Sequence, residues 1–435
     1  MKTVIMKNII SVISFMLVLF MNSCPSLKSQ SNLIEINIEK NVKNIKKVNI
    51  CDLNGNIRYI PLKADAGLLS DIILSDFSKD FVIVSDRRTC ILYDIQGNTI
   101  SKIGNQGKGP GEYIVVFEMK FGLHNQIIIQ DGKSFLVYDL NGKFLRKFDS
   151  KGHTNDSFAA KMIGSWSPIN DSLFIGQVPN HSGKEKYKAV FFNGMGTEIG
   201  YAKNYIISNI NKVAYSSENC DASIYQFSGQ TYFKELLNDT LFLVTNYLTF
   251  EPYYYFNLGK FGMPISYREL SMNEMMTKRN ECIGLMTINE TSKYLFLLCN
   301  FRNHSPTKRS EPKLVPTAYG VNGVSLYYTD NMLGIYEKAT KELVFAKTEK
   351  IEGRLINCGL FNDYDGGPNF LPKKSVNDST LAMWVDAYAL KAHVASIAFK
   401  NSTPKYPEKK RELEKRANSL SENDNPVLIL CTFKK

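Results

Sequence analysis

The sequence predicts an all-β protein, a six-bladed β-propeller whose blades are four-stranded antiparallel sheets. A short polar turn leads six times into a run of β-forming residues, and such repetition indicates a radial array, because one small sheet cannot bury both of its faces. The aromatic content of 12%, with 23 Tyr and 26 Phe, suits broad sheet surfaces. The six runs are residues 81–86, 127–131, 173–177, 241–246, 294–300 and 381–386. The turns before them are Lys79-Asp80, His124-Asn125, Asn170-Asp171, Asn238-Asp239, Ser292-Lys293 and Asn377-Asp378.

The first two units show the repeat most clearly, because they align over 45 residues without a gap. The pattern of each unit predicts four strands. The last two strands form a hairpin, with a glycine in its turn where a tight turn needs positive φ. Four strands are the composition of a propeller blade. The matching residues are Asp86, Tyr93, Asp94 and Gly97 in the first unit and Asp131, Tyr138, Asp139 and Gly142 in the second.

The later units are looser and carry longer loops. Insertions at 259–280 and 301–321 are the longest, and loops of this length are commonly functional. In the fifth unit either 324–328 or 334–337 would be the third strand. The other strands expected are 158–166, 173–178, 189–193 and 198–201, then 232–237, 241–245 and 250–258, then 282–288, 294–299 and 343–347, and finally 355–361, 381–386 and 394–399.

The two ends of the chain are expected to close the ring. Residues 406–420 are charged and helix-permissive, and 426–433 reads as a last, isolated strand. Pairing of this strand with an N-terminal one would complete a blade begun by 48–51 and 57–62. Closure of this kind removes the exposed edge that an open ring would leave.

The first residues have the order of an export signal. Lys2 and Lys7 precede an apolar stretch at 9–20 that is too short to favour a membrane span, and Cys24 follows it. This order predicts a lipoprotein signal at 1–23, a lipidated Cys24, a linker at 24–45 and a propeller at 46–435. The alternative is an ordinary secretory signal with an incidental cysteine.

Charge and cysteine content exclude several classes of protein. The net charge is +11, of which Lys2 and Lys7 account for two, and the basic residues are scattered apart from a cluster at 405–416. We therefore expect no nucleic-acid binding; the excess charge serves solubility, or contact with an anionic membrane or glycan. Cysteines other than Cys24 are odd in number and lack Cys-x-x-Cys spacing, which favours free thiols over a Cys282–Cys299 disulfide.

The segment 102–113 has the sequence Lys-Ile-Gly-Asn-Gln-Gly-Lys-Gly-Pro-Gly-Glu-Tyr. With the ending at 420–428, it resembles the six-bladed propeller lipoproteins of Bacteroidetes, relatives of the NHL-repeat propellers. The resemblance covers essentially the whole mature chain and implies the fold and export, but it brings no catalytic residues to transfer. Acidic residues after the lipidated cysteine accompany surface display in that family. Here none occurs between Cys24 and Glu35, which favours the periplasmic side of the outer membrane.

One mouth of the predicted channel is the candidate ligand site. Loops from the second to the third strand share a face with the loops between blades, so oxygen-bearing side chains would gather there. Such a ring could hold a hard cation such as Ca²⁺, or bind a sugar or peptide; alternatively, each residue only caps its own turn. The candidate residues are Asp86, Arg87, Glu112, Tyr113, Asp131, Gln177, Asn246, Asn300 and Asp386.

Other motifs give no catalytic signature. The glycine-rich loop at 104–111 fits no phosphate-binding template and more simply allows a tight crossing between blades. Asp363 and Asp365 belong to a fragment of a calcium-loop pattern without its distal Glu, so we interpret them as turn residues. The histidines lack metal-ligand spacing, and no Gly-x-Ser-x-Gly elbow occurs.

These observations predict an exported, lipid-anchored monomer that acts as a binding or scaffolding module for a glycan, a peptide or an envelope protein. The membrane would be contacted through the lipid anchor alone. The alternative is a metal-assisted hydrolase or lyase of lactonase type at the same channel mouth, because related propellers include such enzymes. A purely structural envelope component is the third possibility.

Overall fold

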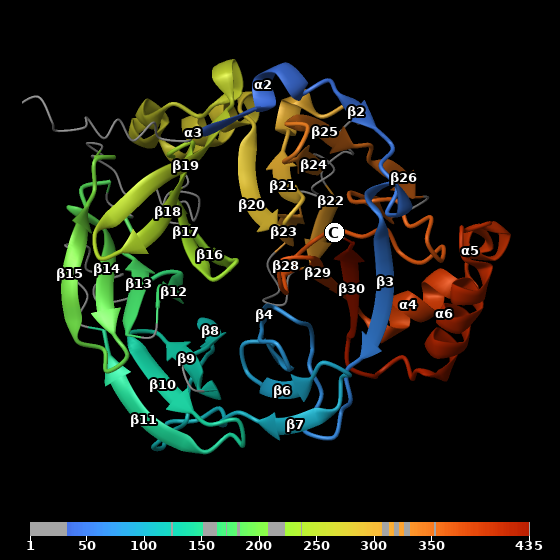
Figure 1. Cartoon of the computed structure of the whole chain (residues 1–435), viewed down its shortest axis with the longest axis horizontal. Coiled ribbons are helices and arrows are strands. Elements are labelled where there is room, and N and C mark those ends of the chain that lie inside the picture. The colour runs from blue at the N-terminus through green and yellow to red at the C-terminus, as the bar shows by residue number, and fades with distance from the viewer. Residues whose placement is uncertain are drawn as a thin grey trace, which may run out of the picture. The chain divides into compact units, whose positions relative to one another are not determined.

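Six antiparallel sheets radiate from a central axis and form a closed ring of blades, as Figure 1 shows. This arrangement confirms the six-bladed propeller that the sequence predicts. The computed structural model describes residues 33–122, 125–150, 163–170, 172–180, 183–207, 222–235, 237–306, 313–316, 322–325, 331–351 and 354–434. Cys24 and the export signal, together with His124 and Asp171 of the predicted turns, lie outside these ranges.

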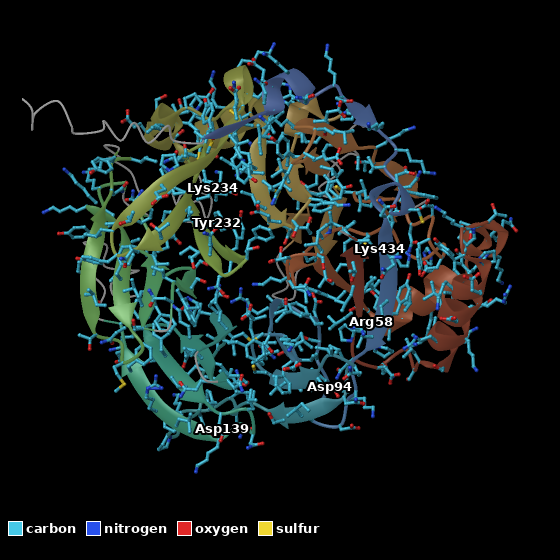
Figure 2. All side chains as sticks on the ribbon, in the orientation of Figure 1. Arg58, Asp94, Asp139, Tyr232, Lys234 and Lys434 are labelled. Atoms are coloured by element: carbon cyan, nitrogen blue, oxygen red, sulfur yellow. The ribbon has the colours of Figure 1, made fainter. Side chains whose placement is uncertain are left out.

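Blades 1 and 2 repeat each other closely. Asp94 and Asp139, both labelled in Figure 2, occupy the same position after the third strand, where each carboxylate accepts hydrogen bonds from two backbone amides of its turn. Gly97 and Gly142 follow with φ of 87° and 80°, a conformation that favours glycine. Blade 1 contains β4 (Leu74–Phe77), β5 (Phe81–Ser85), β6 (Cys90–Asp94) and β7 (Thr99–Lys102). Blade 2 contains β8 (Glu118–Phe121), β9 (Ile127–Asp131), β10 (Ser134–Tyr138) and β11 (Phe144–Asp149).

Blade 4 differs from the prediction by one strand. Its innermost strand, β16 (Ala222–Phe227), was missing from the predicted set, so the run 241–246 is the third strand and not the second. The true first turn is Ser228-Gly229, whose φ values of 49° and 72° are those of a tight two-residue hairpin. Blade 4 continues with β17 (Gln230–Glu235), β18 (Thr240–Asn246) and β19 (Thr249–Asn257).

Blade 3 contains β12 (Trp166–Pro168), β13 (Leu173–Gln177), β14 (Tyr187–Asn193) and β15 (Glu198–Lys203).

Blade 5 decides between the two alternatives for its third strand. The run 334–337 belongs to β24 (Asn331–Glu337), which pairs with β21 (Tyr294–Asn300) along its whole length. Val324 lies instead in β23 (Asn322–Ser325), which forms a separate two-stranded sheet with β22 (Lys313–Pro316). The remaining strands of blade 5 are β20 (Gly284–Glu290) and β25 (Glu342–Ala346).

Blade 6 closes the ring with strands from both ends of the chain. The last strand, β30 (Val427–Phe433), pairs antiparallel with the N-terminal strand β3 (Gly55–Pro61), as predicted. The segment 48–51 is not a blade strand, because Asn49 only forms an isolated bridge to Phe361 and Cys51 begins the 3-10 turn η1 (Cys51–Leu53). The inner strands are β28 (Lys374–Ser375) and β29 (Thr380–Val385), whereas the predicted strand 355–361 falls partly in the small sheet of β26 (Glu349–Ile351) and β27 (Arg354–Asn357).

Residues 34–46 belong to the propeller, so this part of the expected linker at 24–45 is corrected, and residues 24–32 lie outside the described ranges. Strand β1 (Ile34–Asn37) pairs parallel with β19, and β2 (Ile45–Lys46) pairs parallel with β25. Helix α2 (Ile38–Asn41) connects them, and Ile36 and Ile38 are fully buried. Both edge strands would otherwise expose unpaired backbone groups, so this segment protects the outer edges of blades 4 and 5.

The connection between β29 and β30 contains α4 (Ala387–Ala395), α5 (Ile397–Asn401) and α6 (Pro407–Ser419). The predicted helical segment 406–420 is therefore confirmed, but the predicted strand 394–399 is wrong. A short apolar run cannot be assigned to a strand or a buried helix by its pattern alone. Here Val394 lies in α4 and Phe399 in α5, and both side chains are buried. The hydroxyl of Ser396 caps α5 by accepting from the amide of Phe399.

The two faces of the ring are built differently. One face carries the connections between the second and third strands of each blade and the connections between blades, and we call it the loop face. These connections include α3 (Met272–Lys278) and α4–α6. The opposite face, called the turn face, carries the short turns between the first and second and between the third and fourth strands. The loop face also includes the 3-10 turns η4 (Gly259–Phe261), η5 (Ile265–Glu269), η6 (Arg279–Glu281) and η7 (Arg302–His304).

The core lies in the seams between adjacent blades. In the seam of blades 2 and 3, the ring of Phe135 lies 5.0 Å from that of Phe148 and 5.5 Å from that of Trp166. Burial of such side chains contributes about 1.5–3 kcal/mol each. The six cysteines in the described part of the chain are all free thiols, as the sequence favours. Within that part no helix is long and apolar enough to cross a membrane.

Candidate functional site

Asp86 and Asp131 join the blades on the loop face. The carboxylate of Asp86 accepts from the amide of Ser70 at 3.2 Å, and that of Asp131 accepts from the amides of Ile114 and Val115 at 2.9 and 3.2 Å. Each carboxylate therefore ties the connection that enters its blade to the loop after the second strand. For Asp86, partial burial alone would raise the pKa, but backbone hydrogen bonds outweigh it and lower the pKa. Asp86 also caps its own turn by accepting from the amides of Arg88 and Thr89 at 3.0 and 2.7 Å, whereas the amides bonded by Asp131 belong to the connection between blades.

Arg87, Glu112 and Tyr113 also stabilise the crossing between blades 1 and 2. The guanidinium of Arg87 donates to the carbonyl of Val116 at 3.4 Å, and Glu112 accepts from the amide of Gly109 at 2.8 Å inside the glycine-rich loop. Tyr113 is 0% exposed and belongs to the core shared by the two blades. The loop is thus a crossing between blades, and Tyr113 points into their seam.

Gln177, Asn300 and Asp386 lie at the ends of second strands on the loop face, as predicted. Gln177 and Asn300 are buried, with 7% and 8% exposed, and Asn300 accepts from the amide of Arg302 at 3.1 Å. Asp386 directly precedes α4, and burial together with the nearby charge of Asp71 raises the pKa of its carboxyl.

Asn246 lies on the other face of the ring. Because blade 4 has an extra inner strand relative to the prediction, Asn246 ends the third strand and belongs to the β18–β19 turn on the turn face. Its side chain accepts from the amide of Tyr247 at 2.8 Å. The placement of Asn246 at the channel mouth was therefore wrong, and the cause is the one-strand shift in blade 4.

The part of the chain that the structure describes contains no group of three or more His, Cys, Asp or Glu side chains that could hold a metal. In the fragment of a calcium-loop pattern, the carboxylates of Asp363 and Asp365 bind other groups of the protein. Asp363 accepts from the amide of Cys51 at 3.0 Å, and Asp365 accepts from the hydroxyl of Tyr59 at 3.0 Å and the amide of Gly367 at 2.9 Å. These contacts are those of a structural turn that anchors the segment before β3.

A cavity of about 420 Å³ opens on the loop face between blades 4 and 5. It lies within the usual size range of small-ligand pockets. Strands β16 and β20 form its walls, and the connection from β19 to β20 contributes further aliphatic side chains. The lining residues are Ser165, Ser223, Ile224, Lys234, Leu237, Asp239, Leu258, Met263, Ile283, Gly284, Leu285, Met286, Ile288 and Arg302.

Lys234 brings an amine into this apolar cavity. It follows Tyr232 by two residues on β17, so both side chains face the seam with blade 5, and Figure 2 labels the pair. Lys234 is 5% exposed, and its Nζ donates to the carbonyl of Glu235 at 3.1 Å. Among the described residues, no carboxylate lies within ion-pair distance of this amine. Burial lowers the pKa of Lys234 to about 8.

Asp239 and Arg302 are the other charged residues of the cavity. Burial raises the pKa of Asp239, and the charge of Lys234 acts in the opposite direction. The guanidinium of Arg302 is 9% exposed and donates to the carbonyls of Arg279 and Cys282 at 2.9 and 3.2 Å. With both bases protonated and the acid ionised, these three side chains carry one net positive charge.

Sequence reasoning missed this site, although one signal was present. Lys234 interrupts a run of large apolar residues at 232–237 that was already predicted as a strand. A lysine on the buried side of a strand is rare unless it is paired or functional. The packing partners of Lys234 come from 258–302, and no local pattern connects those residues to β17.

The comparisons with known proteins assign the chain to a family. A family model described as a domain of unknown function, DUF4934, matches residues 33–432. The chain belongs to the DUF4934 family. The match spans the whole propeller, including β1 and the closing strand β30. A search of curated proteins found no match.

Two of the solved structures that are similar to this DUF4934 member are Bacteroides proteins. A protein of Bacteroides fragilis NCTC 9343, described only as one thought to be exported, is 15% identical over 93% of this chain and 100% of its own, with a TM-score of 0.64. A DUF4221 member from Bacteroides vulgatus ATCC 8482 is 10% identical over 87% and 96%, with a TM-score of 0.46. At 15% identity the likeness to the Bacteroides fragilis protein supports the propeller fold alone.

Proposed function

We propose that this propeller is an exported binding module whose ligand has an apolar body and an anionic group and occupies the loop-face cavity. The observation that carries the proposal is the buried amine of Lys234, which lacks a carboxylate partner among the described residues. A buried charge is costly unless it is paired. An anionic ligand would supply a directly bonded partner in addition to the attraction of Asp239 in the same cavity, and the apolar wall would bind the rest of the ligand.

The cavity favours a peptide over a glycan. Its apolar lining consists of Ile, Leu and Met side chains, and among the described residues none that lines it carries an aromatic ring. A sugar would need many hydrogen-bond partners for its hydroxyl groups, because polar groups buried without partners are costly. An aliphatic side chain with a nearby carboxylate, as at the end of a peptide, needs only an apolar wall and one base.

The proposed location is the periplasmic side of the outer membrane, reached through a lipid on Cys24. The order of basic residues, apolar stretch and cysteine at the N-terminus supports export and lipidation. Lack of acidic residues directly after Cys24 supports the periplasmic side. We propose that the protein acts as a monomer and meets its ligand with the loop face.

The test is calorimetric titration of the chain from Pro25 onward with short peptides that end in leucine. One set carries a free C-terminal carboxylate and the other an amide. The proposal expects binding of the free acid and at least a tenfold loss on amidation, equivalent to about 1.4 kcal/mol. Lys234→Met should cause a similar loss.

Asn246→Ala is the matched control, because Asn246 lies on the turn face and should leave binding unchanged. Asp131→Ala separates the cavity from the channel mouth that the sequence suggests, since it removes a carboxylate of that mouth. Equal binding of acid and amide peptides, or unchanged binding by Lys234→Met, would contradict the proposal. Preferential binding of oligosaccharides would contradict the ligand class.

A further inference from the structure

The loop-face cavity places a primary amine at the end of an apolar chamber. Lys234 Nζ has one backbone acceptor, the carbonyl of Glu235, and its side chain is held by burial between blades 4 and 5. By contrast, the half-buried Lys188 forms an ion pair with Glu235 at 3.4 Å. An amine without a carboxylate partner keeps its lone pair accessible once it loses its proton. This arrangement is typical of lysines that act as nucleophiles.

Burial of Lys234 allows the neutral amine to exist near neutral pH. Burial is the largest influence and lowers the pKa to about 8, while Asp239, Glu235 and Cys299 act in the opposite direction. Arg302 lines the same cavity and adds positive charge, whereas β16 and β20 contribute no titratable side chain to the lining. An exposed lysine would hold almost no neutral amine at this pH, since its ordinary pKa is about 10.4.

We propose that Lys234 is a nucleophilic amine that captures an aldehyde or ketone with an apolar body as an imine in this cavity. The inference rests on the proposed role of the cavity as the ligand site. It adds a covalent step at the same amine and a second class of ligand, carbonyl compounds. These need an apolar wall and the neutral form of Lys234, whereas an anionic ligand pairs with its ammonium form.

The step needs no oxidant and releases one water. The lone pair of Nζ attacks the carbonyl carbon, and the C–N bond forms while the carbonyl π electrons move to oxygen, which takes up a proton. Nitrogen then loses one proton to give the carbinolamine. The hydroxyl group accepts a second proton and leaves as water while the nitrogen lone pair forms the C=N bond, and the resulting iminium loses its remaining N–H proton to give the imine. Asp239 can deliver the proton that the hydroxyl group accepts, because it lines the same cavity and burial raises its pKa.

The experiment treats the chain from Pro25 onward with butanal and sodium cyanoborohydride, which reduces the imine to a stable secondary amine. Peptide mass mapping then measures the modification rate of each lysine across about pH 6 to pH 10. Lys434, which is exposed and labelled in Figure 2, is the internal reference. We expect Lys234 to react at least tenfold faster than Lys434 at pH 8, with a rate that rises through a midpoint near 8.

Two variants sharpen the test. Lys234→Arg keeps a positive charge but removes the reactive amine, so butyl labelling at this position should vanish while Lys434 labels as before. Asp239→Asn removes a charge that raises the pKa of Lys234, so the midpoint of the labelling profile of Lys234 should move to lower pH while labelling of Lys434 does not change. Circular dichroism of both variants confirms that the comparison concerns folded protein. A Lys234 that labels no faster than Lys434 in the folded wild-type protein would overturn the inference.

The pH dependence of peptide binding and of lysine labelling distinguishes a failure of the covalent step from a failure of the anionic-ligand proposal. An anionic peptide pairs with the ammonium form of Lys234, so its affinity should fall as pH rises through about 8. Imine formation needs the neutral form and should become faster over the same range. Peptide binding without labelling would reject only the reactive amine, whereas labelling without peptide binding would reject only the anionic ligand.

Discussion

Two buried charges, one on each face of the ring, have opposite surroundings. Glu290 ends β20 at the turn face and is 0% exposed, yet it accepts from Lys338 Nζ at 2.6 Å and from the hydroxyl of Tyr225 at 2.8 Å. Lys234 on the loop face is 5% exposed, and within the described part of the chain its Nζ donates to a backbone carbonyl and to no carboxylate. The first charge has a direct partner within the fold, and the second is the one for which we propose a ligand.

This difference follows from how the two faces are built. On the turn face the short turns of blades 4, 5 and 6 bond to one another: Asp378 accepts from the hydroxyl of Ser228 at 2.7 Å, and its carbonyl accepts from the amide of Ser292 at 2.7 Å. The loop face carries the long connections and the cavity. We infer that the turn face stabilises the ring and that the loop face is the one open to function.

The largest expected effect is at Glu290. Glu290→Ala should lower the free energy of unfolding by about 3–5 kcal/mol, because it leaves Lys338 and Tyr225 without their partner in a buried site. Urea denaturation measures this change. Replacing both Glu290 and Lys338 by Met should cost less than the single alanine variant, since no unpaired charge then remains. An alanine variant as stable as wild type would show that the pair is not structural.

Lys234→Met should change the free energy of unfolding in the opposite direction. Removing a buried ammonium should raise the free energy of unfolding at pH 7 by up to about 3 kcal/mol. Below the folded pKa of about 8, Lys234 is protonated in both states and wild type carries the full cost. Between about 8 and 10.5 the unfolded chain binds a proton that the folded chain has released, so wild-type stability rises with pH and the advantage of the variant disappears.

Urea denaturation of wild type and Lys234→Met at several pH values checks this prediction, and the difference between the two curves isolates Lys234 from other titrating groups. Lys234→Arg is the control, because it retains a buried charge that stays protonated over the whole range. A destabilised Lys234→Met at pH 7 would indicate that the amine has a structural role.

A smaller effect is expected at the blade crossings of the loop face. Asp131→Ala removes the acceptor for the amides of Ile114 and Val115 and should cost about 1–2 kcal/mol. Asp131→Asn keeps one acceptor oxygen and should recover part of this loss. Thermal unfolding with and without added calcium measures both variants and also tests for a cation at this position. Calcium-dependent stability that is lost in Asp131→Ala would contradict a purely capping role.

The smallest effect is expected at Asn246 on the turn face. Its side chain bonds only the next amide in an exposed turn, so Asn246→Ala should change the free energy of unfolding by no more than about 0.5 kcal/mol. Peptide binding should also be unchanged. A loss of binding by this variant would place a ligand on the turn face and reverse the roles we assign to the two faces.

The blade repeat, the closing strand and the crossing role of the glycine-rich loop could be predicted because each depends on local chemistry. The Asp-x-x-Gly turn after Asp94 caps itself and needs no distant partner, so its recurrence at Asp139 was visible in the sequence. Errors arose where local signals were ambiguous. The turn at Asn238 resembled those that precede second strands, and the apolar run 394–399 suited a strand as well as a buried helix.

The sequence by itself determined the number of blades, the position of most strands and the way the ends of the chain meet. Only the tertiary structure decided that Asn246 lies on the turn face, that β1 and β2 extend blades 4 and 5, and that Lys234 lies in a cavity with Asp239 and Arg302. Turns and strands arise from neighbouring residues, which a sequence shows directly. Burial and the pKa of an amine depend on residues that only the closed ring brings together.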